Sequence, residues 1–133
     1  MLRYLLHTNT VICVIKRRPL SALQMFNEHA GHTAISAITQ AELLHGAEKS
    51  NAPARSLAVV EDFCTRLEVL AYGPKAAQHF GSIRGALEKR GQLIGVNDLH
   101  VTAQARSEEL TLVSNNLCEL APVDALQLAN WAM

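Results

Sequence analysis

Cysteine is scarce in this sequence, and the few cysteines form no pattern. Cys13, Cys64 and Cys118 are widely spaced, and no Cys-x-x-Cys pair occurs. A disulfide framework is therefore excluded, and a reducing compartment, the cytosol, fits this composition best. Each cysteine stands among apolar residues, which predicts that all three are small residues of the core rather than reactive thiols.

An excess of one charge and a long apolar run are also missing. The 12 Lys and Arg residues balance the 12 Asp and Glu residues, so the net charge gives no overall attraction for nucleic acid, although a local basic patch is compatible with it. No apolar stretch approaches the ~20 residues of a membrane-spanning helix. The apolar run after Arg3 stops at His7, too early for the apolar core of a signal peptide. We expect a cytoplasmic protein without a membrane segment.

The composition that is present is typical of one folded domain. The chain has 133 residues, of which 49% are hydrophobic and 18% are charged. A chain of this length buries enough surface for a stable core, and this composition argues against disorder. We expect a single domain over residues 1–133, without internal repeats or linkers.

Residues 3–16 predict a strand followed directly by a helix. Residues 3–6 form a short apolar run that ends in polar residues, and either Thr8 or Asn9 can cap the following helix with its side-chain oxygen. Residues 11–15 are rich in β-branched side chains, so a strand is the alternative there. The cations of residues 16–18 suit the C-terminus of a helix and favour the helix.

Strand and helix patterns alternate along the rest of the chain. The expected strands are residues 33–36, 68–72, 111–114 and 126–128, and the expected helices are residues 21–29, 39–47, 57–67, 74–90 and 98–107. Trp131 is expected to cover the sheet. The alternation predicts an α/β fold with a mainly parallel central sheet flanked by helices.

Three acidic residues are expected near the end of the first strand, where open α/β sheets collect ligands and catalytic groups. Glu42 lies in the helix after the second strand, Asp98 opens a helix, and Glu119 follows the strand at 111–114. Carboxylates brought together repel one another unless a cation is present. Mg²⁺ prefers a few carboxylate oxygens plus waters, and it can activate water against a phosphodiester.

Each of these residues has a structural explanation as well. Glu42 completes a capping box with Thr39, and Asp98 is favourable at the N-terminus of a helix in any protein. Glu119 is typical of a solvated surface, and a lone histidine such as His7 is more often a hydrogen-bonded structural residue than a ligand. Spacing alone therefore leaves both interpretations open.

Basic residues occur in three places along the chain. They are Arg17, Arg18, Lys89, Arg90 and Arg106. They can supply contacts to phosphate groups of a nucleic acid, or they can simply form solvated faces.

Several motifs together resemble a known family over nearly the whole chain. They are residues 1–6 followed by Thr8-Asn9, residues 14–19, residues 36–39 with 41–44, residues 46–50, residues 94–100, Asn115-Asn116 and Asn130-Trp131. The Gly-x-Asn-Asp segment at 95–98 and the Ala-Glu-Leu segment at 41–43 are specific in combination. On these motifs the chain resembles the VapC toxins, the PIN-domain ribonucleases of bacterial type II toxin–antitoxin pairs.

The resemblance implies a PIN-like three-layer fold and an endoribonuclease that depends on Mg²⁺ or Mn²⁺. It implies RNA, tRNA in particular, as the substrate, a homodimer, and a VapB-type antitoxin as the partner. That antitoxin covers the site and supplies the contact with operator DNA. The family's acids match Glu42, Asp98 and Glu119, and its metal ligands match His7, Asp98 and Glu42. Its supporting polar residues match Asn9, Ser36, Asn115 and Asn116.

His7 is the departure from the family pattern, which has an aspartate at that place. A neutral histidine removes one negative charge from the metal site, and imidazole suits Zn²⁺, Cu²⁺ or Ni²⁺ better than Mg²⁺. One charge at about 4 Å is worth on the order of 4 kcal/mol at an effective dielectric of about 20, before desolvation. A fraction of that energy weakens Mg²⁺ binding at least about tenfold. We therefore expect RNase activity with Mg²⁺ to be lost or strongly reduced.

Two other functions remain open from the sequence. The chain can act as a non-catalytic module that binds its antitoxin and tunes repression. It can also carry a different metal chemistry, with His7 and the acids holding Zn²⁺ or Mn²⁺.

Overall fold

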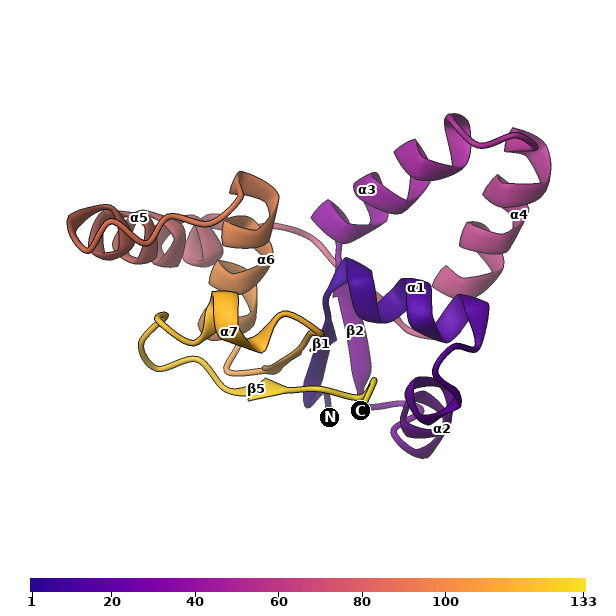
Figure 1. Cartoon of the computed structure of the whole chain (residues 1–133), viewed down its shortest axis with the longest axis horizontal. Helices are drawn as coiled ribbons and strands as arrows, with labels where there is room; N and C mark the ends of the chain where they lie inside the picture. The colour runs from indigo at the N-terminus through magenta and orange to yellow at the C-terminus, as the bar shows by residue number, and fades with distance from the viewer.

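A parallel sheet of five strands runs through the molecule in the order β3-β2-β1-β4-β5 (Figure 1). The structure, a computed structural model, describes all 133 residues. The strands are β1 (Tyr4–Leu6), β2 (Thr33–Ser36), β3 (Glu68–Leu70), β4 (Thr111–Val113) and β5 (Leu128–Ala129). Every neighbouring pair is parallel, so the expected mainly parallel sheet is confirmed and is parallel throughout.

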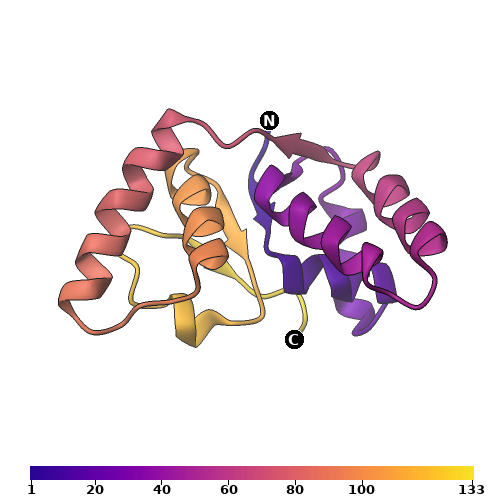
Figure 2. The same cartoon turned by 90° about the horizontal axis from the view of Figure 1, so that it is seen from above.

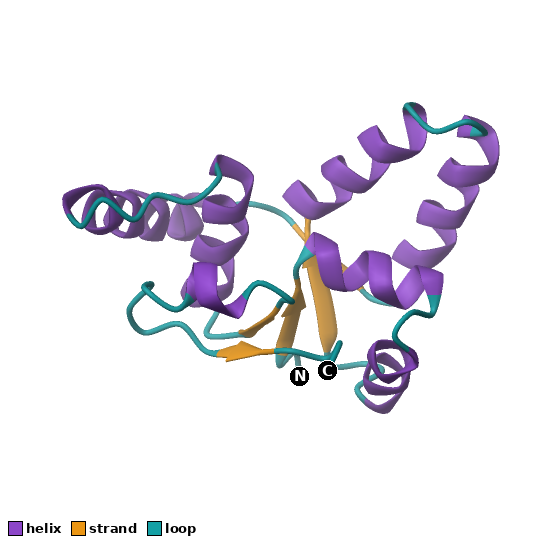
Figure 3. Ribbon diagram, in the orientation of Figure 1, coloured by secondary structure: helices purple, strands orange, loops and turns teal.

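Seven helices surround this sheet (Figure 3). They are α1 (Thr8–Lys16), α2 (Leu20–Glu28), α3 (Ala37–Glu48), α4 (Pro53–Cys64), α5 (Pro74–Lys89), α6 (Val96–Ser107) and α7 (Leu117–Leu120). Helices α1 to α4 gather at one end of the molecule and α5 to α7 at the other (Figures 1 and 2). None of the helices combines the length and the apolarity needed to cross a bilayer.

Alternate side chains of the central strand serve two different cores. Leu6 of β1 packs in a core with side chains of α1, α2, α3 and α4, whereas Leu5 packs in a second core with α6 and α7. Both leucines are 0% exposed. A strand that is buried on both faces reads as a continuous apolar run, which is the pattern of residues 4–6. The layers are helix, sheet and helix, as the PIN-like expectation requires.

The sequence predicted most elements and misplaced some of their ends. The segment at residues 11–15 is helical, as favoured, and Trp131 covers the sheet with 3% of its surface exposed. The third strand ends at Leu70 and the last strand lies at Leu128–Ala129, because neighbouring strands, rather than the apolar pattern, set the paired length. Helix α7 was not predicted, since four residues are too few for a periodic signal.

Two predicted helix caps are wrong. The N-cap of α1 is His7, without a side-chain hydrogen bond, so neither Thr8 nor Asn9 is the cap. Helix α3 begins at Ala37, and Ser36 is its N-cap, with Oγ accepting from the Ile38 N–H at 3.0 Å. The capping box of Thr39 and Glu42 therefore does not form, because the helix has already begun before Thr39.

The predicted burial of the cysteines is correct for two of the three. Cys13 and Cys64 are partly buried and pack against the core of α1 to α4. Cys118 is exposed, because it lies on α7, whose buried side is held by Leu120.

Candidate active site

Two strand ends place the central residues of the site side by side. Leu6 of β1 pairs with Val113 of β4, so His7 and Ser114 are the next residue on each strand. The backbone N–H of His7 donates to the Val113 carbonyl at 2.9 Å. Since all strands are parallel, this is the carboxyl edge of the sheet, where ligand sites of open α/β folds lie.

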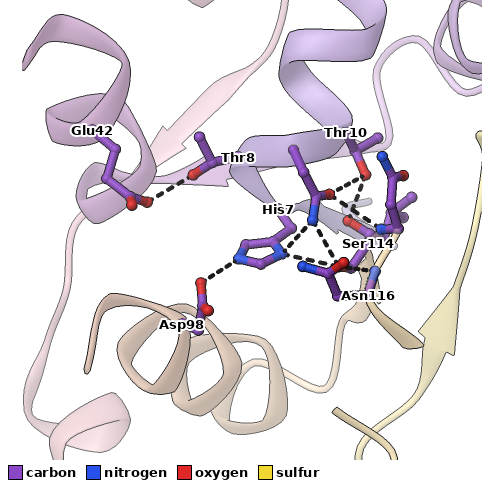
Figure 4. A network of polar contacts seen from close by, with 10 residues as sticks. His7, Thr8, Thr10, Glu42, Asp98, Ser114 and Asn116 are labelled. Carbon is purple, nitrogen blue, oxygen red and sulfur yellow. Dashed lines mark hydrogen bonds and ion pairs between the residues drawn. The ribbon is translucent and has the colours of Figure 1, made fainter. Parts of the chain in front are cut away.

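The His7 ring bridges the sheet edge and helix α6 (Figure 4). Its Nε2 lies 2.7 Å from Asp98 Oδ1, and its Nδ1 lies 2.9 Å from Ser114 Oγ. His7 is 5% exposed and Ser114 is 0% exposed. Both ring nitrogens thus have a polar partner, as a buried imidazole requires.

A small polar network supports this ring from the side of α1. Asn9 Oδ1 accepts from the Asn115 backbone N–H at 3.1 Å, and Asn9 Nδ2 lies 3.3 Å from both Ser114 Oγ and His7 Nδ1. The backbone N–H of Asn116 donates to Ser114 Oγ at 3.0 Å. Asn115 and Asn116 therefore contact this network through their backbone N–H groups.

Asp98 is the acid in direct contact with His7. The hydrogen bond from His7 holds the pKa of Asp98 below its ordinary value, and burial opposes this effect. The nearby Glu119 lowers the same pKa further. Asp98 is therefore ionised in the folded protein at neutral pH, and Glu119 of α7 stands next to it on an exposed stretch of chain.

Glu42 lies on α3, in the second turn rather than the predicted first turn. Its carboxylate accepts a hydrogen bond from Thr8 Oγ1 at 2.7 Å (Figure 4). Glu42 also lines a surface hollow together with residues 95–98. Glu42 and Asp98 thus border the same hollow, although no group of the chain binds both.

Ser36 does not belong to this network. It is 0% exposed, and its hydroxyl caps α3 through Ile38. Ser36 therefore caps α3, the helix that carries Glu42.

These side chains do not present the ligand set of a magnesium site. No three His, Cys, Asp or Glu side chains are placed to hold a metal ion. Mg²⁺ needs several oxygen ligands around one point, whereas the inner oxygen of Asp98 faces an imidazole nitrogen at 2.7 Å. The residues as arranged do not fit Mg²⁺.

Two contributors to the site were missed by sequence reasoning, Ser114 and Thr8. Ser114 joins His7 over a separation of 107 residues, and no local pattern reports such a contact. Its place directly after a predicted strand was the available signal, since the carboxyl ends of parallel strands meet at one edge.

Two of the basic residues proposed for phosphate contacts are engaged elsewhere. Arg90 pairs with Asp124 at 2.8 Å, and Arg106 donates to His79 at 2.9 Å. The cations beside the site are Lys16 and Arg55, which line a groove with Thr8 and Glu42.

A parallel α/β sheet with acids and amides at its carboxyl edge is the arrangement expected of a PIN domain. The family model of the PIN domain matches residues 4–117. Ribonuclease VapC2 of Haemophilus influenzae is 58% identical over 131 residues, which cover 98% of this chain and 99% of that protein. The chain therefore belongs to the VapC ribonucleases of the PIN-domain family.

More distant relatives agree in length and fold. The tRNA(fMet)-specific endonuclease VapC of Salmonella typhimurium is 44% identical and covers 98% of this chain and 99% of its own. The DNA-bound VapBC complex from Salmonella typhimurium has a TM-score of 0.95 at 44% identity, with coverage of 98% and 99%. VapBC2 from Rickettsia felis bound to promoter DNA has a TM-score of 0.91 at 34% identity, with the same coverage.

Proposed function

We propose that this chain is the toxin of a VapBC-type toxin–antitoxin pair, built as an endoribonuclease for tRNA, and that His7 removes most of its activity with Mg²⁺ or Mn²⁺. Relatives named as VapC ribonucleases and tRNA endonucleases support the reaction class. PIN-domain ribonucleases generally use a divalent metal. Three free cysteines are compatible with a cytoplasmic location.

The contact between His7 Nε2 and Asp98 Oδ1 at 2.7 Å carries the proposal of impaired activity. Asp98 is the acid that we expect to hold the metal, with Glu42 across the hollow and Glu119 beside it. An imidazole in place of a carboxylate removes a negative charge and two oxygen ligands, and it engages Asp98 itself. Loss of a group that only supports a metal ligand typically weakens metal affinity roughly 10- to 100-fold, so replacement of a ligand is expected to weaken it at least as much.

His7→Asp is the test of this function. We expect the variant to cut a tRNA pool with Mg²⁺ or Mn²⁺ at least about 100-fold faster than the unmodified chain, and to bind Mn²⁺ at least about tenfold more tightly by calorimetry. His7→Asn serves as the matched control, because asparagine has the size of aspartate without its charge. Asp98→Asn or Glu42→Gln on the His7→Asp background should abolish the gain. A His7→Asp variant that binds Mn²⁺ but cuts no RNA contradicts the nuclease assignment.

The second candidate function is a non-catalytic antitoxin-binding and co-repressor module. A groove bounded by α1, α3 and α4 exposes Ile12 and Val59, which are 40% and 43% exposed, with Lys16 and Arg55 at its side. We propose that a VapB-type antitoxin occupies this groove, since similar folds occur in VapBC complexes on DNA. We expect the toxin chain to be a homodimer in that assembly, reaching operator DNA only through the antitoxin.

Val59→Asp tests the groove separately from catalysis. It should weaken antitoxin binding and the operator affinity of the complex while the toxin alone keeps its folding transition. Asn51→Asp, at an exposed position of the loop after α3, is the control. If Val59→Asp leaves antitoxin affinity unchanged, the groove is not the binding surface.

A further inference from the structure

The hydrogen bonds around Ser114 fix the direction in which its own proton points. The Asn116 backbone N–H donates to Ser114 Oγ at 3.0 Å, and Asn9 Nδ2 donates to it at 3.3 Å. A serine hydroxyl has two lone pairs and one proton. With both lone pairs engaged, the remaining partner, His7 Nδ1 at 2.9 Å, receives the proton.

The orientation of the Asn9 amide is fixed independently. Its Oδ1 accepts from the Asn115 backbone N–H at 3.1 Å, and a backbone N–H is always a donor. The NH₂ group of Asn9 must therefore face Ser114 and His7 Nδ1, at 3.3 Å from each. Nδ1 thus faces two donors, and the serine O–H, the nearer at 2.9 Å, takes its single lone pair.

We propose that Ser114, oriented by Asn9 and the backbone of Asn116, is a positioning residue that keeps His7 in the neutral tautomer with its proton on Nε2. In that tautomer Nδ1 accepts and Nε2 donates to Asp98 Oδ1. The other tautomer requires Ser114 Oγ to accept a third hydrogen bond, for which it has no lone pair. His7 consequently presents an N–H, rather than a lone pair, to the carboxylate.

This environment is the inverse of that around a metal-binding histidine. A histidine ligand turns its lone pair toward the metal and donates its other N–H to a carboxylate, carbonyl or water. Here the lone pair is directed into the buried Ser114 and Asn9, and the N–H faces Asp98. His7 is therefore a hydrogen-bond donor that stands where a cation would neutralise Asp98, and it is not a ligand for Zn²⁺ or Mn²⁺.

Nitrogen-15 NMR of histidine-labelled protein without metal tests this tautomer directly. The His7 signals are assigned by their loss in His7→Gln, since the chain has 6 histidines. We expect a protonated Nε2 and an unprotonated Nδ1 at neutral pH. A proton on Nδ1, alone or together with one on Nε2, overturns the proposal.

Asn9→Asp replaces the N–H donor that faces His7 Nδ1 with a carboxylate oxygen, and it barely changes the shape of the side chain. The new carboxylate oxygen can only accept, so we expect Nδ1 to become protonated in this variant. Asn116→Ala is the matched control, because Asn116 acts through its backbone N–H, and it should leave Nδ1 unprotonated. An unprotonated Nδ1 in a folded Asn9→Asp variant means that the network does not set the tautomer, and it contradicts the proposal.

A Co²⁺ titration adds a readout that is independent of RNA cleavage. If His7 is not a ligand, His7→Ala binds Co²⁺ at least as tightly as the unmodified chain, because Asp98 is freed, whereas loss of a ligand histidine would weaken Co²⁺ binding at least about tenfold and would overturn the proposal. The inference deepens the proposed function by stating how His7 acts on Asp98. The two fail separately, because the tautomer can be as proposed even if His7→Asp cuts no RNA.

Discussion

The two ends of strand β1 each hold a histidine, and they hold it in different ways. At the carboxyl end, the His7 ring is buried and hydrogen-bonded through both nitrogens to Asp98 and Ser114. At the amino end, the His29 ring packs between aromatic rings, 4.6 Å from Tyr4 and 5.5 Å from Trp131 between centroids, with no hydrogen bond from the ring.

His7 therefore contributes through the hydrogen bonds of its ring nitrogens, whereas His29 contributes through the packing of its ring. At His7 the identity of each ring nitrogen matters, because Asp98 and Ser114 depend on it as donor and acceptor. At His29 the ring supplies contact area, and aromatic pairs of this kind are worth about 0.5–1.5 kcal/mol beyond their burial. A parallel sheet concentrates polar chemistry at its carboxyl edge and can close its other edge with simple packing.

The largest expected effect on stability comes from the amino end of β1, where Trp131 packs against Tyr4 and His29. Trp131→Ala removes a side chain that is 3% exposed and that contacts Tyr4 at 5.2 Å between ring centroids. We expect the free energy of unfolding to fall by about 3–5 kcal/mol, measured by urea denaturation. Met133→Ala is the control, since Met133 is 87% exposed. Equal stability of the two variants would show that packing of Trp131 does not stabilise the amino end of strand β1.

His7→Ala is expected to have the next largest effect. It leaves the buried Ser114 hydroxyl and the partly buried Asp98 carboxylate without their partner, and an unsatisfied buried group is worth about 1–3 kcal/mol. We expect a loss of stability in that range by urea denaturation, with exposed His45→Ala as the control. Since the residues are coupled, His7→Ala with Ser114→Ala should cost less than the sum of the single changes.

Phenylalanine substitutions sharpen the comparison most directly. His29→Phe keeps the aromatic contacts with Tyr4 and Trp131, and we expect it to change stability by less than about 0.5 kcal/mol, as neutral surface changes do. His7→Phe keeps the ring and removes both nitrogens, and it should destabilise by about 1–3 kcal/mol. Similar losses in the two variants, measured by thermal denaturation, would contradict the distinction between the two ends.

The smallest expected effect is on the free energy of unfolding at acidic pH. The pKa of Asp98 in the folded state is lowered, first by the hydrogen bond from His7. The ionised carboxylate therefore stabilises the fold above its unfolded pKa of about 3.9, and this contribution is lost as the pH falls through the lower folded pKa.

Asp98→Asn should be less stable than the unmodified chain at neutral pH, and the difference should shrink below about pH 4. The side chain of Asp98 keeps 29% of its surface in water, so solvent screening reduces the effect. Urea denaturation across the acid range measures it, with exposed Asp62→Asn as the control. A constant difference at all pH values would mean that the charge of Asp98 makes no contribution.

Local patterns predicted the elements better than the contacts between them. The apolar run at residues 4–6 predicted a strand and the pattern of residues 74–90 predicted a helix, and the structure confirms both as β1 and α5. Thr39 and Glu42 match a capping box in sequence, yet Ser36 begins the helix three residues earlier because strand β2 ends there. A local sequence motif does not show where the preceding strand ends and the helix begins.

The sequence by itself determined the order of the strands and of every helix except the short α7, because buried and exposed positions repeat with the period of each element. It also determined that an acid, Asp98, lies near the start of a helix and that His7 directly follows the first strand. Only the tertiary structure decided that His7 meets Asp98 across 91 residues and Ser114 across 107. Parallel pairing sets the register of β1 against β4, and that register turned the polar residues at the end of β1 into a closed hydrogen-bond network around one imidazole.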